Sequence, residues 1–155
     1  MSTFSSTNRT VQTFHGNGFA LKYYSDWVDA TIYILAGPIL DNIQHNITIQ
    51  VDPTPNVPDL QTYVQVQTAD LETMLKSCTV LKREFIRLFN GMAAFRLVYS
   101  WIPTDEVQLV QDQVYVLHNG KGYKLTASMN KYSRQSIGPE IEKMLLSFTP
   151  MEAGR

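Results

Sequence analysis

The sequence lacks the features that define several large classes of protein. Cys78 is the single cysteine among 155 residues, which excludes an internal disulfide and fits a reducing compartment. No stretch approaches the roughly 18 uninterrupted apolar residues of a transmembrane helix. Residues 1–14 are polar and rich in Ser and Thr, without the apolar run of a secretory signal. We therefore expect a cytoplasmic protein that does not itself insert into a membrane.

The sequence also has no excess of charge of one sign and no cluster of metal-ligating residues. The chain has 13 Lys and Arg against 14 Asp and Glu, with no block of like charge, so it offers no basic surface to nucleic acid. The histidines His15, His45 and His118 stand singly, which is typical of ordinary surface or turn positions and not of a metal site. No catalytic constellation is evident. We expect no nucleic-acid partner, no metal, no cofactor and no enzymatic activity.

Most of the chain is patterned as β-strand. Hydrophobic residues make up 44% of the sequence, enough for one core without disulfide staples. Gly37-Pro38 is expected to end the second strand, and the pairs Asn90-Gly91 and Asn119-Gly120 favour two-residue type I′ hairpins. Clusters of β-branched and aromatic residues between turn signals predict strands at 18–23, 30–35, 46–51, 79–89, 92–102, 107–118 and 122–129.

Two segments carry helical periodicity. Residues 59–78 form an apolar stripe whose one polar member is Gln67, and a second helix is expected to open at Gly138-Pro139. The predicted fold is α+β, with a mainly antiparallel sheet of about six to seven strands flanked by two helices. We expect a flexible lead at 1–17, a single domain at 18–150 and a tail at 151–155.

Glutamines interrupt the apolar face of the strand at 107–118. Gln111 and Gln113 lie between Leu109 and Tyr115 on the odd positions, which are otherwise apolar. Three of the even positions carry valine, so both faces of the strand should be at least partly covered. A buried amide needs hydrogen-bond partners. These amides either face solvent or cap local backbone, or they lie in an apolar groove where they can bond to an inserted segment.

The order of short motifs from Gly18 to Pro150 resembles the family of proteins related to DcrB, and within it the Eag chaperones of type VI secretion effectors. The motifs are Gly18-Phe19 with Trp27, residues 60–64 with Gln67, Leu71 and Leu75, Asn90-Gly91 with residues 94–97, residues 111–115, residues 125–127 and residues 146–148. The resemblance implies a PsbP-like α/β/α sandwich. It also implies a homodimeric cytoplasmic chaperone.

By this resemblance the protein shields the hydrophobic N-terminal transmembrane helices of an Rhs or PAAR-containing effector before the effector is loaded onto the VgrG spike. The family pattern implies a client-binding groove, which is lined by Ile32, Ile34, Gln67, Leu75, Gln111 and Gln113. A small-ligand or lipid-binding module with the same fold is the alternative interpretation, because the same apolar pocket suits either occupant. An enzyme of unknown type has the least support from the residues.

Overall fold

The computed structural model describes residues 9–104 and 107–151, which divide into two compact units with a boundary between Thr31 and Ile32. The first unit is an antiparallel hairpin of β1 (Val11–His15) and β2 (Ala20–Tyr24). An ion pair of 2.8 Å joins Arg9 to Asp26 in this unit. Strand β1 lies within the expected lead at 1–17. It pairs with β2, a contact that the sequence of the lead by itself does not reveal. Residues 1–8 lie outside the described part.

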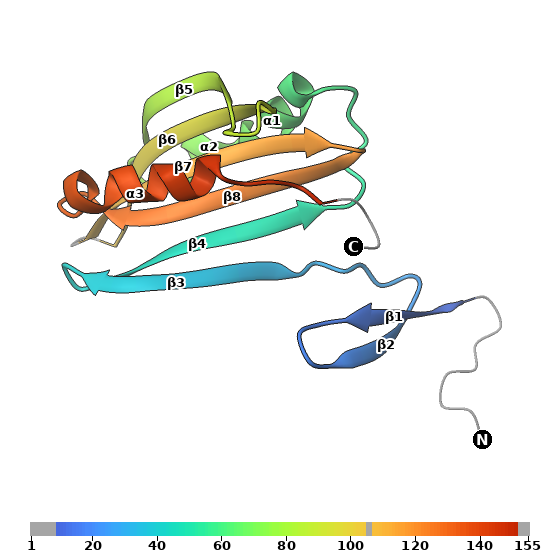
Figure 1. Cartoon of the computed structure of the whole chain (residues 1–155). Helices are drawn as coiled ribbons and strands as arrows, with labels where there is room; N and C mark the ends of the chain where they lie inside the picture. The colour runs from blue at the N-terminus through green and yellow to red at the C-terminus, as the bar shows by residue number, and fades with distance from the viewer. Residues whose placement is uncertain (1–8, 105–106, 152–155) are drawn as a thin grey trace. The chain divides into compact units, whose positions relative to one another are not determined.

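The second unit is built on one antiparallel sheet of six strands in the order β3-β4-β8-β7-β6-β5 (Figure 1). Neighbouring strands pair along most of their length, so the register assigns each side chain to one face. The strands are β3 (Ile32–Leu40), β4 (Ile43–Asp52), β5 (Thr79–Arg87), β6 (Ala93–Thr104), β7 (Val107–His118) and β8 (Lys121–Asn130).

Helices cover parts of both faces of this sheet. The helix α1 (Leu60–Thr68) and the short α2 (Leu71–Met74) lie on one face, and α3 (Arg134–Leu146) lies on the other. Val114 of β7 packs in the core beneath α3, and its neighbour Tyr115 packs in the core beneath α1. Both are 0% exposed, so the predicted covering of both faces of this strand is confirmed. The predicted α+β sandwich is likewise confirmed.

Positive backbone φ angles identify the tight turns. Asn119 and Gly120 have φ of 50° and 73° between the paired residues His118 and Lys121, which confirms the type I′ prediction there. At Asn90-Gly91 the prediction was wrong. Only Gly91 has positive φ, and its N–H donates to the carbonyl of Leu88, so the loop contains one more residue and ends in a left-handed glycine.

The boundaries of two predicted elements needed correction. Strand β3 continues through Gly37-Pro38 to Leu40 with a register shift between Ala36 and Ile39. An edge strand tolerates a proline because its outer side has no ladder to donate to. The predicted helix at 59–78 is interrupted at residues 69–70 and ends at Met74. The Thr68 hydroxyl donates to the Val64 carbonyl at 2.8 Å, a bond that competes with continued helix.

Helix α3 begins at Arg134, four residues before the predicted opening at Gly138-Pro139. Pro139 therefore lies inside the helix and lacks the N–H that would donate to the carbonyl of Gln135. A tertiary contact precedes this start: His45 is 2% exposed, and its Nε2 lies 2.7 Å from the Ser133 hydroxyl. The expectation that His45 is an ordinary surface or turn residue was therefore wrong.

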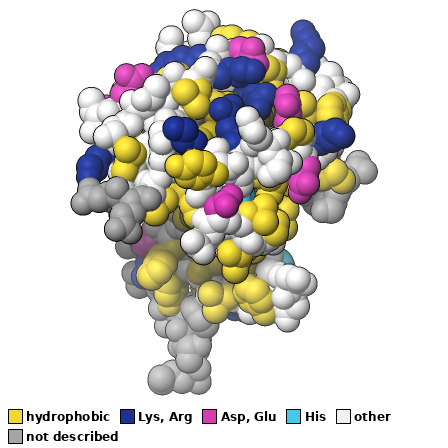
Figure 2. Space-filling model, turned by 90° about the vertical axis from the view of Figure 1, so that its left-hand side faces the viewer, with side chains coloured by type: hydrophobic (Ala, Val, Ile, Leu, Met, Phe, Trp, Pro, Cys, Tyr) yellow, Lys and Arg dark blue, Asp and Glu magenta, His cyan; other side chains and the backbone are white. Residues whose placement is uncertain are grey.

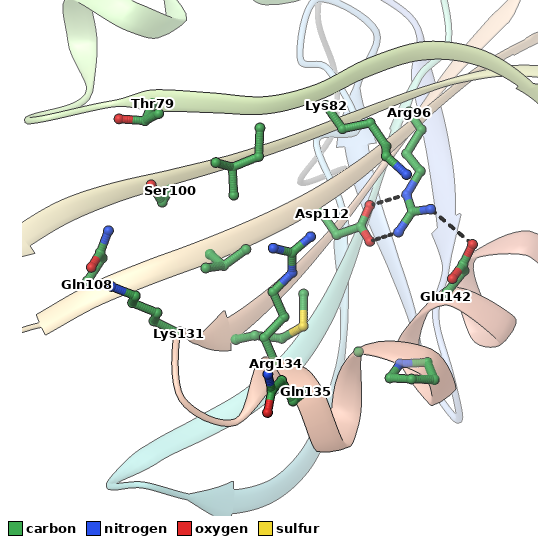
Figure 3. A pocket seen from close by; sticks show the side chains of 15 residues that line it. Thr79, Lys82, Arg96, Ser100, Gln108, Asp112, Lys131, Arg134, Gln135 and Glu142 are labelled. Atoms are coloured by element: carbon green, nitrogen blue, oxygen red, sulfur yellow. Dashed lines mark hydrogen bonds and ion pairs between the residues drawn. The ribbon is translucent and has the colours of Figure 1, made fainter.

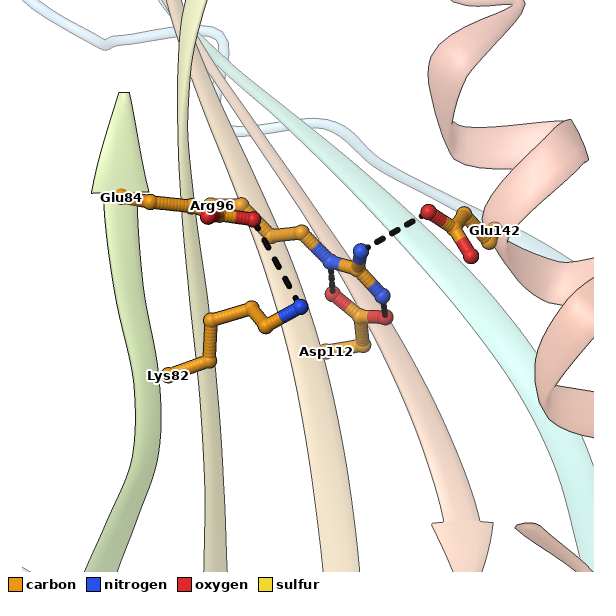
Figure 4. A network of polar contacts seen from close by, with 5 residues as sticks. All are labelled: Lys82, Glu84, Arg96, Asp112 and Glu142. Atoms are coloured by element: carbon orange, nitrogen blue, oxygen red, sulfur yellow. Dashed lines mark hydrogen bonds and ion pairs between the residues drawn. The ribbon is translucent and has the colours of Figure 1, made fainter. Parts of the chain in front are cut away.

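Arg96 of β6 joins a buried carboxylate of β7 and a half-exposed carboxylate of α3 (Figure 4). The Arg96 guanidinium donates to both oxygens of Asp112, at 3.0 and 2.7 Å, and to Glu142 of α3 at 3.0 Å. The side chains of Arg96 and Asp112 are 12% and 4% exposed, whereas that of Glu142 is 46% exposed. The hydrogen bonds that Arg96 donates to the Asp112 carboxylate are the main cause that raises the pKa of Arg96 above its usual value. The guanidinium thus stays charged and bidentate.

Replacement of Arg96 by methionine should lower the free energy of unfolding by about 3 kcal/mol, because the Asp112 carboxylate would stay buried without its partner. Urea denaturation of the wild type and the variant measures the change. Glu142→Gln is the matched control and should cost less than about 1 kcal/mol, since Glu142 is half exposed. Equal losses in the two variants would contradict the assignment of Asp112 as the partner that matters.

None of the helices in the described residues combines the length and the apolar character needed to cross a lipid bilayer.

Candidate functional site

The sheet face beneath α1 carries the two glutamines of β7, and we call it the amide face. The register places Gln111 beside Tyr99 of β6 and Ser128 of β8, and it places Gln113 beside Leu97 of β6 and Thr126 of β8. Strand β7 lies between β6 and β8, so its side chains have neighbours on both sides. The amides therefore lie in the middle of the face.

Gln111 links an aromatic half of the amide face to a polar half. Its Oε1 accepts a hydrogen bond from the Tyr99 hydroxyl at 2.6 Å and from the Trp101 indole N–H at 3.0 Å. Its Nε2 donates to the Ser128 hydroxyl at 3.0 Å. One of the two amide N–H groups is left over after this count, because Nε2 carries two donors. Gln111 is partly exposed, so that donor can reach a molecule lying on the face.

Gln113 is enclosed beneath the surface. It is 3% exposed, and its Nε2 donates to the Tyr99 hydroxyl at 3.2 Å and to the Thr126 hydroxyl at 3.3 Å. Its Oε1 accepts from the Tyr115 hydroxyl. Gln113 therefore supports the face from within and presents no unused amide group. Neither alternative drawn from the sequence describes this outcome, because neighbouring side chains satisfy Gln113 fully and Gln111 in all but one N–H.

Three buried tyrosines complete the aromatic half. Burial raises the pKa of Tyr63 to about 12, and it also raises the pKa values of Tyr99 and Tyr115 above the usual value for a phenol. All three are 2% exposed or less. The rings of Tyr63 and Tyr115 meet edge to face at 6.2 Å. The phenols stay protonated at neutral pH, so Tyr99 and Tyr115 can act as the donors that Gln111 and Gln113 require.

The other half of the amide face extends from β8 to β3 and is floored by short polar side chains. Ser128 pairs with Asn46 of β4, and Thr126 pairs with Thr48. These four side chains are partly exposed, unlike the aromatic half beneath α1. We call the set Asn46, Thr48, Thr126 and Ser128 the polar floor.

Apolar residues of the edge strand border the polar floor. Ile34 pairs with Thr48 and Ile32 pairs with Gln50, so both isoleucines point to the amide face. Ile32 is 50% exposed and Ile34 is 64% exposed. Every residue of β3 is exposed, including the apolar ones on both faces. Strand β3 pairs with β4 on one side and is the edge of the six-stranded sheet on the other, and an exposed, largely apolar edge strand of this length is a surface suited to a partner.

Gln67 and Leu75 come from the helical segment on the same side of the sheet. Gln67 lies on α1 and is exposed, whereas Leu75 follows α2 and packs against the core cluster of the aromatic half. The structure thus places Ile32, Ile34, Gln111 and Gln113 on one sheet face. Their role in binding a client, like that of Gln67 and Leu75, stays a prediction.

Several residues of the site were not singled out from the sequence. Tyr99 and Trp101 alternate with Phe95 along β6, and that pattern is typical of ordinary core. Ser128 and Thr126 are two apart on β8, where short polar residues suggest a solvated face. Only the strand register shows that these side chains meet the glutamines. No group of three potential metal ligands occurs within residues 9–104 and 107–151.

Replacement of Gln113 by leucine should destabilise the fold by about 2 kcal/mol, because the Tyr115 hydroxyl would lose its acceptor inside the core. Denaturant unfolding followed by circular dichroism measures the loss. Gln50→Leu is the matched control on an exposed part of the same face, and it should change stability by about 0.5 kcal/mol or less. If the two variants are equally stable, the buried network does not contribute as described.

Alkaline pH should unfold the protein through its buried tyrosines. In the folded state burial raises the pKa of each phenol above its ordinary value of 10.0, whereas in the unfolded state the phenol ionises near that value. The folded chain therefore binds more protons, and stability should fall as the pH rises from about 10 toward 12. Near-ultraviolet phenolate absorbance, recorded alongside circular dichroism, should show Tyr63, Tyr99 and Tyr115 ionising only with unfolding. Ionisation of all eight tyrosines in the intact fold would contradict this.

Solved structures with the same fold include proteins from three different bacteria. The protein PA94 of Pseudomonas aeruginosa, of unknown function, is 19% identical with a TM-score of 0.74, and the match covers 92% of this chain and 99% of that one. CyanoP, the PsbP of Synechocystis sp. PCC 6803, is 14% identical with a TM-score of 0.53 over 97% and 98% of the two chains. LpqN, which is involved in cell envelope biogenesis of Mycobacterium tuberculosis, is 12% identical with a TM-score of 0.51 over 88% and 87%.

At such low sequence identity the structural similarity shows the fold alone. The fold is PsbP-like, as the resemblance implied. No curated protein matches the sequence. The model of the DcrB family matches residues 20–147, which include all of β2 and every strand and helix of the second unit. The chain therefore belongs to the DcrB family.

Proposed function

We propose that the protein is a chaperone of the Eag type, which binds the hydrophobic N-terminal helices of a type VI secretion effector and keeps them soluble until the effector is loaded onto the VgrG spike. The observation that carries the proposal is the exposure of Ile32 and Ile34 beside the polar floor. A folded monomer gains nothing by leaving such an edge strand uncovered.

The chemistry of the amide face suits a membrane-type helix with small residues. Short hydroxyl and amide side chains let a helix backbone approach closely, as small residues do where helices pack in membranes. The polar floor and the remaining N–H of Gln111 then supply hydrogen bonds, while Ile32 and Ile34 supply apolar contact. A helix without small residues would be held too far away for those bonds.

The energetic scale of this binding is sufficient. A membrane-spanning segment of about 20 apolar residues aggregates in water. Covering about 1,000 Å² of it at about 25 cal/mol/Å² contributes roughly 25 kcal/mol before the costs of association and ordering are subtracted. The proposal therefore requires no catalytic step and no cofactor. It does include a cytoplasmic location and a homodimer, in which two amide faces together enclose a client longer than one face.

Ile34→Asp should abolish copurification of the effector, because it places a charge where the client helix packs. The test coexpresses the full chain with the tagged N-terminal segment of the effector encoded by the adjacent gene and measures recovery of the pair. The substitution is at an exposed position, at 64% exposure, so folding is expected to be kept and is verified by circular dichroism.

Leu35→Asp provides a closely matched control. Leu35 is the next residue of β3, is 63% exposed, and pairs with Ile47 on the opposite face. It should leave recovery of the effector unchanged if the amide face is the binding surface. Loss of the effector with both variants, or with neither, would count against this surface. Gln111→Ala should also weaken recovery of the effector, because it removes the amide that we propose bonds to the client helix.

A further inference from the structure

A cavity of about 790 Å³ opens on the sheet face opposite the amide face. It lies among β5, β6 and β7 and the beginning of α3 (Figure 3). It is of a size typical of small-molecule sites. It arises because α3 packs mainly on β8, so the ends of the neighbouring strands on this face are left partly uncovered.

The floor of the cavity is apolar. Val110 and Met129, which are 2% and 1% exposed, form part of its lining. The register shift between Val80 and Lys82 in β5 leaves Leu81 unpaired, and Leu81 lines the cavity while 47% exposed. A bulge re-aims a side chain in this way. An apolar portion of a ligand would therefore find contact on the floor and on one wall.

Two cations at the cavity lack a carboxylate partner within the described part of the chain. Lys131 and Arg134 line the cavity and appear in no ion pair, whereas Lys82 pairs with Glu84 at 3.6 Å and Arg96 is held by its two carboxylates. Figure 3 shows Arg134 reaching from the start of α3 toward the sheet. On the side of the molecule seen in Figure 2, Lys and Arg side chains gather around apolar ones.

A serine hydroxyl also lines the cavity. Ser100 is 6% exposed and its hydroxyl bonds to no other described residue, yet no buried side-chain nitrogen or oxygen in the described part of the chain lacks a partner, so this hydroxyl is open to the cavity. The oxygens of an anion in the cavity would accept from it. Thr79, which pairs with Ser100 across the strands, and the amides of Gln108 and Gln135 add further donors to the lining.

We propose that this cavity binds a small amphiphilic anion, in which a phosphate or carboxylate group bonds to Lys131, Arg134 and Ser100 and an apolar chain lies on Val110 and Met129. Two cations, a hydroxyl and an apolar floor match that chemistry, because each part of the ligand meets its complement. The lining carries four cationic side chains, those of Lys82, Arg96, Lys131 and Arg134, against the two carboxylates of Asp112 and Glu142, which both bond to Arg96, so the cavity keeps an excess of positive charge.

Isothermal titration of the full chain with octyl phosphate tests the proposal, with inorganic phosphate and octanol as separate probes. Octyl phosphate should bind, and each of the other probes should bind at least about tenfold more weakly, since each lacks one part of the ligand. Absence of octyl phosphate binding would overturn the proposal. Equal affinity for inorganic phosphate would also overturn it, because it would assign the site to the free ion.

Variants locate the site. Lys131→Ala and Arg134→Ala should each weaken octyl phosphate binding by about tenfold, because each removes a charge-assisted hydrogen bond. Ser100→Ala should weaken octyl phosphate binding less than these two variants, because it removes a hydrogen bond from a neutral hydroxyl. Lys143→Ala is the matched control, since Lys143 is an exposed cation of α3 that is not among the residues lining this cavity. An equal loss with Lys143→Ala would contradict the assigned location.

The inference is independent of the proposed chaperone function, because the cavity and the amide face lie on opposite sides of the sheet. Ile34→Asp should leave octyl phosphate binding unchanged, and Arg134→Ala should leave recovery of the effector unchanged. Failure of one proposal is thereby distinguished from failure of the other.

Discussion

Strand β7 imposes the constraint on which the rest of the second unit depends: it buries polar side chains on both of its faces. Asp112 is 3% exposed on the face of α3, and Gln113 is 3% exposed on the amide face. A buried carboxylate or amide is costly without partners, so neighbouring strands must supply them in the correct register. Arg96 and Tyr99 of β6 do so on the two faces. Any slip of β6 against β7 by one residue would exchange these partners and leave both groups unsatisfied.

This constraint also separates two surfaces with different chemistry. On the amide face the glutamines are bonded to the aromatic half, which leaves the polar floor and the exposed isoleucines of β3 as the surface that we propose for a partner. On the other face the Arg96–Asp112 pair occupies one wall of the cavity to which we assign an anion, and Lys131 and Arg134 of the lining form no ion pair with the described residues. One strand with polar residues on both sides thus organises both candidate sites.

The elements that were predicted well are those whose signal is local. Val107–His118 and the turn at Asn119-Gly120 agree with the structure because alternation of side chains and positive φ are properties of a few adjacent residues. Two of the boundaries that were wrong depend on distant residues. The start of α3 follows the contact of Ser133 with His45. Similarly, Pro38 is tolerated because β3 lies at the edge of the sheet.

The candidate site divides in the same way. The sequence by itself determined the class of fold, and it drew attention to Gln111 and Gln113 as polar residues in an apolar face. Only the tertiary structure decided that Gln113 is enclosed, that Tyr99 and Trp101 are the partners, and that Ile34 is exposed beside Thr48. The reason is physical: burial and hydrogen bonding are set by strand register, which brings together residues far apart along the chain.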